Sequence, residues 1–205
     1  MTRLWLSPAP LILASGSVTR RDMLIAAGLP VETVKPDIDE RAVERPLAEQ
    51  GVAVDRIASA LAEAKALAVS KLRSGRLVLA ADQTLTCEGR SFHKSADAAA
   101  AAEQIAALAG RAHELHSAFA LAQNGVVLAQ GRATARLTMR PLDAAFIGRY
   151  VEAAGPAILA SVGGYQLEGL GAQLFARIEG DHFTILGLPL LPVLQALRDL
   201  GHLSR

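Results

Sequence analysis

Short apolar runs alternate with segments of helical period along this chain. The runs 11–14 and 77–81 are brief, apolar and bounded by small or polar residues, and 31–34 alternates, so all three are predicted to be strands. Apolar side chains recur at helical spacing over 19–27 and 52–72, which predicts a helix in each segment. Strands and helices in alternation favour an α/β fold.

Polar and turn-forming residues mark the boundaries of the next elements. The segment 35–47 contains two prolines and seven charged residues and is predicted to be a loop. The strand at 77–81 is expected to end at Asp82. Ser95 is expected to cap an alanine-rich helix that Gly110 ends.

An Asn-Gly pair at 124–125 separates two strand-like runs, 113–122 and 126–138, and predicts an antiparallel hairpin. A hairpin set among strand and helix units predicts a mixed sheet flanked by helices. No proline-, glycine- or serine-rich linker divides the chain, so we expect a single domain over residues 1–205. The remaining expected elements are a helix over 143–152, a glycine-rich loop over 163–171, a strand over 174–179 and a last helix from Pro189 or Pro192 to Gly201.

Composition excludes several classes of protein. The chain has 205 residues, with 21 Lys+Arg against 20 Asp+Glu, and this near-zero net charge excludes a strongly basic binder of nucleic acid polymers. Any anion must be held by a local cluster of cations in a cleft. Cys87 is the single cysteine, which fits a reducing compartment, and no apolar run approaches the ~20 residues of a membrane span. We expect a cytoplasmic protein with no membrane partner.

Familiar catalytic motifs are missing. The glycine spacing from Gly164 to Gly169 is followed by Leu170 rather than by Lys, so the Walker phosphate loop is excluded. His113 and His116 lie three residues apart on a predicted strand, on opposite faces, and are interpreted as structural rather than as ligands of one metal.

Small and basic residues gather where the first strand meets the first helix. Ser15 and Ser17 flank Gly16, and the first turn of the helix carries Arg20 and Arg21. Hydroxyls, backbone N–H groups and guanidinium groups at a helix N-terminus form an anion site. A capped helix with solvated arginines gives the same pattern, and both readings stay open at this point.

Carboxylates gather at two further places. Asp82 follows a buried strand, where a carboxylate needs a partner or a metal to offset its desolvation, although a turn or cap aspartate also fits. Asp37, Asp39 and Glu40 cluster in the predicted loop, and such clusters are usually solvated. Carboxylate oxygens suit Mg²⁺ when phosphates complete the coordination.

Four separated segments resemble the Maf family, also called septum formation inhibitor-like proteins. LILASGSVTRRDML followed by PDIDE is similar to the N-terminal signature of the family, and LVLAADQTLTCEGRSFHK is similar to its strand with an aspartate and a later lysine. AGRAHELHSAFA resembles its hairpin entry, and 163–189 resembles its GGYxxxGxG and GLP ending. The resemblance covers nearly the whole chain.

The resemblance implies an enzyme and its fold. Members are nucleoside triphosphate pyrophosphatases that use Mg²⁺ or another divalent metal cation and release a nucleoside monophosphate and pyrophosphate, a house-cleaning of non-standard nucleotides. The implied fold is a mixed, strongly bent sheet flanked by helices, with two lobes around one deep nucleotide cleft, akin to inosine triphosphatases. A homodimer is a family expectation only.

The resemblance also implies which residues form the site. Arg20, Lys65 and Lys94 would neutralise the triphosphate, and Asp82, with Glu40 as the other candidate, would hold the metal or deprotonate the attacking water. Which of the two carboxylates holds the metal and which deprotonates the water stays open. The implied phosphate-binding, catalytic and metal-binding positions are Ser15, Ser17, Arg20, Arg21, Glu40, Lys65, Asp82 and Lys94.

Two positions bear on the choice of base. Gln83 after Asp82, and Glu168 before Gly169, resemble the branch of the family associated with 7-methyl-GTP rather than the dTTP and UTP branch. A carboxylate at 168 suits the N–H donors and positive charge of 7-methylguanine. The favoured substrate is therefore 7-methyl-GTP. The alternatives are a dTTP/UTP pyrophosphatase, a non-catalytic nucleotide-binding regulator of septum formation, and a phosphotransferase.

Overall fold

The computed structural model describes residues 4–205, whose strands form a mixed sheet in the order β2-β1-β3-β5-β6-β7, with β4 paired to β3. The chain divides into two compact units. Three strands contribute residues to both units: β3 (Val78–Cys87), β5 (Ala112–Gln123) and β6 (Val126–Met139). The first unit comprises the chain up to Asp82, 117–133 and 187–205, and the second comprises 83–116 and 134–186.

The strands at the start of the first unit are parallel. β1 (Leu11–Leu13) pairs with β2 (Val31–Thr33) on one side and with β3 on the other, with Ile12 opposite both Glu32 and Val78. All three residues of β1 are completely buried. A continuous apolar strand of this kind needs cover on both faces of the sheet.

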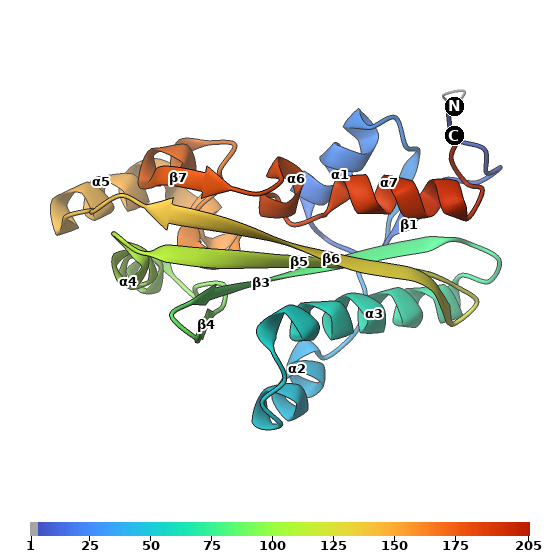
Figure 1. The fold of residues 1–205 in the computed structure, drawn as a ribbon, viewed down its shortest axis with the longest axis horizontal. Coiled ribbons are helices and arrows are strands. Elements are labelled where there is room, and N and C mark those ends of the chain that lie inside the picture. Colours follow the sequence, from blue (N-terminus) through green and yellow to red (C-terminus); the bar gives the residue numbers. More distant parts are fainter. Residues whose placement is uncertain (1–3) are drawn as a thin grey trace. The chain divides into compact units, whose positions relative to one another are not determined.

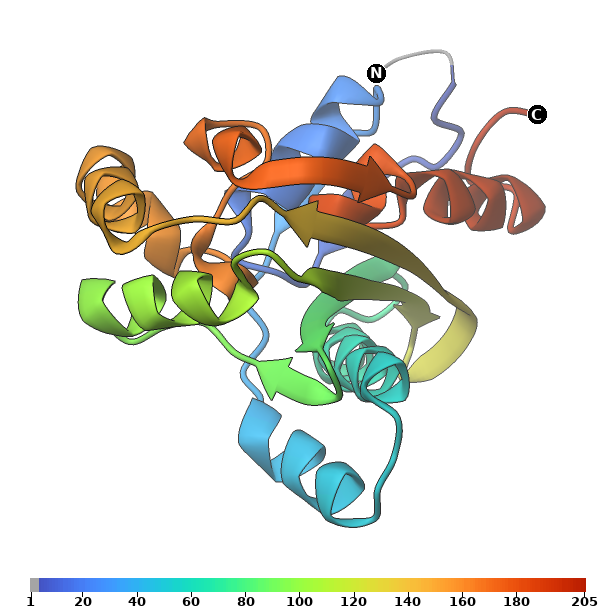
Figure 2. The ribbon, with the colours of Figure 1, turned by 60° about the vertical axis from the view of Figure 1, so that its left-hand side comes forward.

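Helices supply that cover. In Figures 1 and 2, α3 (Val54–Leu72) runs along one face of the first unit's strands, and α1 (Val18–Ala26) and α7 (Leu190–Asp199) lie over the opposite face. The connection from β1 through α1 to β2 is the parallel strand–helix–strand unit that the sequence pattern predicted.

The contact between α3 and the sheet is made largely of alanine. Small side chains let a helix and a sheet approach closely, so the long side chain of Lys65 on α3 reaches the strands. The completely buried alanines of this contact are Ala58, Ala62 and Ala66 of α3, Ala80 of β3, and Ala118, Ala120 and Ala122 of β5.

The prediction of a loop over 35–47 was wrong. A helix, α2 (Glu40–Glu49), begins after Asp39, whose side chain accepts hydrogen bonds from the backbone N–H groups of Arg41 and Ala42. Such a cap offsets the loss of one helical hydrogen bond at Pro46 inside the helix. No residue of α2 is buried, which is why its pattern resembled a solvated loop.

Two boundaries also differ from the prediction. β3 continues through Asp82 to Cys87, because Leu85 and Cys87 alternate with Thr84 and Thr86 as in any half-buried strand. The alanine-rich helix α4 (Ala98–Leu108) is capped by Asp97 instead of Ser95: the Asp97 carboxylate accepts from the backbone N–H of Ala100.

The core of the second unit lies between its strands and helices. Leu85, Leu115 and Leu137, from three neighbouring strands, pack with Ile105 of α4 and Ile147 of α5 (Ala144–Ala154). The other elements of this unit are β4 (Arg90–Phe92), β7 (Phe175–Glu179), α6 (His182–Ile185) and the 3-10 turns η1 (Gly155–Leu159), η2 (Val162–Gly164) and η3 (Leu170–Leu174).

The predicted hairpin between β5 and β6 is confirmed. Asn124 and Gly125 have φ of +53° and +76°, the left-handed pair that a two-residue turn of this type requires. Asn124 also accepts a hydrogen bond from the backbone N–H of Gly75 at 2.7 Å. The turn is therefore fastened to the segment that follows α3.

The two ends of the described chain pair with each other. Trp5 forms an isolated antiparallel bridge with Leu203, and its ring stacks on that of His202 at 6.2 Å between centroids. Ser7 Oγ lies 2.5 Å from His202 Nδ1. Trp5 is only 5% exposed and belongs to the first unit.

The predicted fold class, a mixed α/β sheet flanked by helices, is confirmed. The bent form of the sheet, the single domain and its cleft stay predictions. Within the described part of the chain, no helix combines the length and the hydropathy that crossing a membrane requires.

Candidate functional site

A charged cluster of Glu40, Lys65 and Asp82 lies in the first unit. Lys65 Nζ is 2.5 Å from Asp82 Oδ1 and 2.9 Å from Glu40 Oε1. The Lys65 and Asp82 side chains are only 7% and 12% exposed, whereas that of Glu40 is 54% exposed. We call these three residues the carboxylate–lysine cluster. It buries two opposite charges and keeps a third at the surface.

Three elements bring the cluster together. Asp82 lies on β3 directly after two completely buried alanines, and Lys65 reaches it from α3 across the alanine contact. Glu40 is the first residue of α2, and the Asp39 cap fixes the start of that helix. Asp39 is therefore occupied in capping, and of the acidic segment only Glu40 joins the cluster.

The cluster has free oxygens. Asp82 Oδ1 accepts from Lys65, but Asp82 Oδ2 forms no hydrogen bond with any described residue. Glu40 likewise uses only Oε1. Two carboxylates with free oxygens fit Mg²⁺, which commonly takes one or two protein carboxylates and fills its other positions with water and phosphate. No group of three or more His, Cys, Asp or Glu able to hold a metal occurs among residues 4–205.

The residues of the predicted anion site lie together at the turn between β1 and α1. Ser15 Oγ accepts from the backbone N–H of Ser17 at 3.2 Å, and Ser17 Oγ caps the helix by accepting from the backbone N–H of Arg20. The N–H groups of Gly16, Val18 and Thr19 have no acceptor within the described chain. They are free to bind an anion.

Arg20 ties this turn to the strand that carries Asp82. Its Nη1 donates to the carbonyl of Ala81 at 2.7 Å and to Ser15 Oγ at 3.4 Å, and its Nε donates to the carbonyl of Gly187 at 2.8 Å. Burial lowers the pKa of the Arg20 guanidinium, and the charges of Asp82 and Glu40 act in the opposite direction. Nη2 has no hydrogen-bond partner in the described chain.

Gly187 was not predicted from the sequence as part of this site. It has φ of +95°, and a Cβ there would lie 3.3 Å from Arg20 Nη2. A glycine before Leu-Pro is the only signal in the sequence, and nothing in that signal points to Arg20.

Arg21 lies apart from this arrangement. Its Nε donates to Asp22 Oδ1, its Nη2 lies 2.8 Å from the same oxygen, and its side chain is 43% exposed. The geometry therefore favours Arg20 over Arg21 as the phosphate ligand, and the assignment of Arg21 stays a prediction.

The other predicted site residues belong to the second unit. Gln83 donates through Nε2 to the carbonyls of Thr184 and Ile185, both at 3.0 Å, and so ties β3 to α6. Lys94 and Glu168 are exposed. The roles of all three in base or phosphate binding stay predictions.

Three rings form an aromatic cluster in the second unit: His113, Tyr165 and Phe175. His113 Nε2 lies 2.7 Å from Tyr165 Oη, and the three ring centroids are 4.8 to 5.9 Å apart. Burial lowers the pKa of His113 to about 4 and raises that of Tyr165. His116, on the other face of β5, lies between Thr86 and Thr134. Each histidine thus has side-chain partners within the second unit, and its interpretation as structural stays a prediction.

The sequence is similar to those of several known proteins. The Maf-like protein family matches residues 10–200. A 7-methyl-GTP pyrophosphatase of Mesorhizobium japonicum is 54% identical over 93% of this chain and 96% of its own length. A nucleoside triphosphate pyrophosphatase of Rhodopseudomonas palustris is 53% identical over 96% of each chain, and a 7-methyl-GTP pyrophosphatase of Brucella abortus is 50% identical over 92% and 94%.

One solved structure adds little. A nucleoside-triphosphatase (dITP/XTP pyrophosphatase) of Mycobacterium abscessus covers 63% of this chain and 72% of its own, with a TM-score of 0.34 and 18% identity. A similarity this low leaves the architecture to be judged from the strand order itself.

Proposed function

This chain belongs to the Maf-like protein family, and we propose that it hydrolyses nucleoside triphosphates to a monophosphate and pyrophosphate, with 7-methyl-GTP as the favoured substrate. One observation carries the proposal. Arg20 Nη1 bonds both to Ser15, in the anion-binding turn, and to the carbonyl of Ala81, the residue before Asp82. A triphosphate held at the turn therefore lies beside the carboxylate–lysine cluster.

The turn binds the phosphate oxygens. The free N–H groups at the start of α1 and the hydroxyls of Ser15 and Ser17 donate to them, and Arg20 Nη2 adds a charged donor. Because the other nitrogens of Arg20 are held by carbonyls, the guanidinium is fixed before the substrate arrives. Fixed donors stabilise the negative charge that develops on the departing pyrophosphate.

Asp82 is the candidate base. Its free Oδ2 accepts a proton from the water that attacks the α-phosphorus, and the α–β phosphoanhydride bond breaks as pyrophosphate leaves. Lys65 holds Oδ1, which orients the carboxylate, and its ammonium partly neutralises the two carboxylates beside the anionic substrate.

Glu40 would hold Mg²⁺ or another divalent cation, and Asp82, whose only free oxygen is Oδ2, would be a ligand in place of its role as the base. When bound, the ion would supply positive charge that neutralises the triphosphate and would lower the pKa of a bound water. Exposed Glu40 is the more adaptable of the two ligands, because α2 is not packed into a core.

Glu168 is the proposed selector for the base. Its carboxylate accepts from the N1–H and the exocyclic amine of guanine, and it attracts the positive charge of the 7-methylated ring. Uracil and thymine present mostly acceptors, which the carboxylate repels. The relatives named 7-methyl-GTP pyrophosphatase support this choice of substrate over dTTP and UTP.

The test is pyrophosphate release from 7-methyl-GTP, GTP, dTTP, UTP and CTP with Mg²⁺. We expect 7-methyl-GTP to be preferred and Asp82→Asn to lower kcat at least about 100-fold, because a general base contributes that much or more. Asp199→Asn, an equal change at an exposed position of α7, is the control and keeps the wild-type rate. Glu168→Gln should lower 7-methyl-GTP turnover more than UTP turnover.

Each alternative gives a different result. A preference for UTP or dTTP assigns the chain to the branch of the family that acts on dTTP and UTP. Nucleotide binding without pyrophosphate release from any substrate contradicts the enzyme and favours a regulator. Release of pyrophosphate that Asp82→Asn leaves unchanged removes Asp82 from the chemistry.

A further inference from the structure

The loop that carries Glu168 begins in an unusual backbone conformation. Gly163 and Gly164 have φ of +84° and +73°. A Cβ at Gly163 would lie 2.6 Å from the Tyr165 ring and 2.8 Å from Leu85. Only glycine fits there, and the two glycines turn the chain so that the Tyr165 ring enters the core.

Tyr165 is held inside the second unit by its hydroxyl and its ring. It is 4% exposed, and its hydroxyl lies within hydrogen-bond distance of Nε2 of His113, itself 1% exposed. Phe175 packs edge-on against the ring at 4.8 Å. Since His113 Nδ1 is buried with no partner among residues 4–205, the contact with Tyr165 is the hydrogen bond that holds this imidazole.

The backbone around Tyr165 is also fastened. Ser161 Oγ donates to the carbonyl of Tyr165, and Tyr150 Oη donates to the carbonyl of Gly164 at 3.1 Å. The N–H of Gly163 donates to Gln104 Oε1 at 2.9 Å. Residues 163–165 are therefore fixed from several sides of the core.

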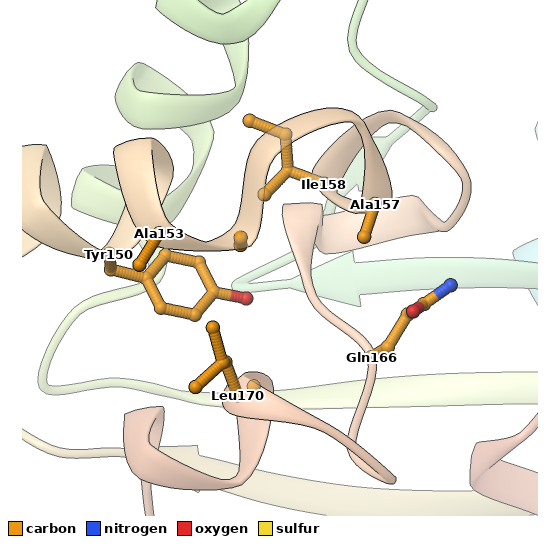
Figure 3. Close-up of a pocket in the computed structure, with 8 residues that line it drawn as sticks. Tyr150, Ala153, Ala157, Ile158, Gln166 and Leu170 are labelled. Carbon is orange, nitrogen blue, oxygen red and sulfur yellow. The ribbon is translucent and has the colours of Figure 1, made fainter.

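The next stretch packs on the core through Leu167 and borders a small pocket on its other side. Figure 3 shows a small pocket in which Tyr150 and Leu170 face each other, with Ile158 above them. Glu168 is exposed and lies three residues beyond Tyr165. The pocket is lined by Tyr150, Ala153, Ala154, Ala157, Ile158, Gln166, Leu170 and Gly171.

We propose that Tyr165, anchored by His113, is a positioning residue for base selection: it fixes the loop so that the Glu168 carboxylate meets the base. The inference rests on the proposed function, in which Glu168 contacts the base. The stretch 166–171 borders a pocket on one side and packs on the core through Leu167, so the hydrogen-bonded Tyr165 is the polar anchor at its start. Tyr165 touches neither substrate nor metal in this account.

The test removes the hydroxyl and keeps the ring. We expect Tyr165→Phe to lower the ratio of kcat/KM for 7-methyl-GTP to that for UTP about fivefold, the effect of one lost hydrogen bond, mainly through KM. His113→Gln keeps an N–H near the Nε2 position and should retain most of the ratio, whereas His113→Leu should lose it. Melting temperatures of all variants are measured, and assays are run well below the lowest of them.

A double-mutant cycle separates positioning from general support. If Tyr165 acts through Glu168, Tyr165→Phe changes the substrate ratio in the wild type and not in Glu168→Gln. A change of equal size in both backgrounds overturns the inference, and so does an unchanged ratio in Tyr165→Phe and His113→Leu with lowered melting temperatures only. A wild type that releases no pyrophosphate from any nucleotide is a different failure, that of the proposed function.

Discussion

The carboxylate–lysine cluster and the aromatic cluster both bury polar groups, but in opposite ways. Lys65 and Asp82 are buried as ions, paired at 2.5 Å, and connected to solvent through the half-exposed Glu40. His113 and Tyr165 are buried as neutral groups in a single hydrogen bond. Burying ions costs far more than burying a neutral pair.

That difference indicates what each cluster is for. Neutral groups suffice where a residue only supports the fold, as in the aromatic cluster that holds Tyr165 of the glycine-rich loop. The carboxylate–lysine cluster keeps its charges beside a turn with free N–H groups, where, in the proposed function, they would act on an anionic substrate.

Lowering the pH should destabilise the aromatic cluster. The pKa of His113 is about 4 in the folded chain and 6.5 in the ordinary group, so the unfolded chain binds the proton more readily. The contribution of neutral His113 to the free energy of unfolding is fully present above pH 6.5. It falls as the pH drops towards 4, by as much as about 3 kcal/mol.

Urea unfolding between pH 7 and 4 measures this loss. His113→Gln has no imidazole to protonate, and its stability should depend less on pH across that window. An equal pH dependence in this variant would assign the loss to other groups.

Removing the central cation should break the charged cluster. Lys65→Met leaves the Asp82 carboxylate buried without its partner, and we expect a loss of about 2 kcal/mol, below the range for a fully buried pair because Asp82 keeps some exposure. Lys71→Met, at an exposed position of the same helix, should change stability by less than about 0.5 kcal/mol. Chemical denaturation of the two variants checks the difference, and equal losses would contradict it.

Of these changes, one at Glu40, the exposed residue of the carboxylate–lysine cluster, should affect stability least. Glu40→Gln removes an ion pair of a half-exposed carboxylate, so its stability should fall by less than about 1 kcal/mol. Its pyrophosphatase rate should nevertheless fall roughly tenfold or more, as expected of a metal ligand. Glu49→Gln, which alters a surface pair on the same helix, is the control for both measurements. A wild-type rate in Glu40→Gln would exclude Glu40 as a ligand.

Local patterns predicted most of the fold. Apolar runs and turn residues identified the strands, the long helix and the Asn124-Gly125 hairpin, because each signal lies within a few neighbouring residues. Helix α2 was missed for the opposite reason: it buries nothing, and its stability comes from the Asp39 cap, which the proline and the charges obscured.

The site was less accessible to local reasoning. The residue types near Ser15 and Asp82 indicated anion and metal chemistry. Lys65, by contrast, is a single cation on an alanine-rich helix, and only the alanine contact with the sheet brings it to Asp82. The links from Arg20 to Gly187, and from His113 to Tyr165, join positions 167 and 52 residues apart, and no periodicity in a sequence reports such pairs.

The division into two units gives each its own optical reporter. The chain has one tryptophan, Trp5, in the first unit, and its two tyrosines, Tyr150 and Tyr165, are both in the second. Fluorescence excited at the red edge of the protein absorption band comes from Trp5 and reports on its stack with His202. Tyrosine absorbance reports on the glycine-rich loop and its surroundings. A single unlabelled sample thus reports whether the two units melt together or one after the other.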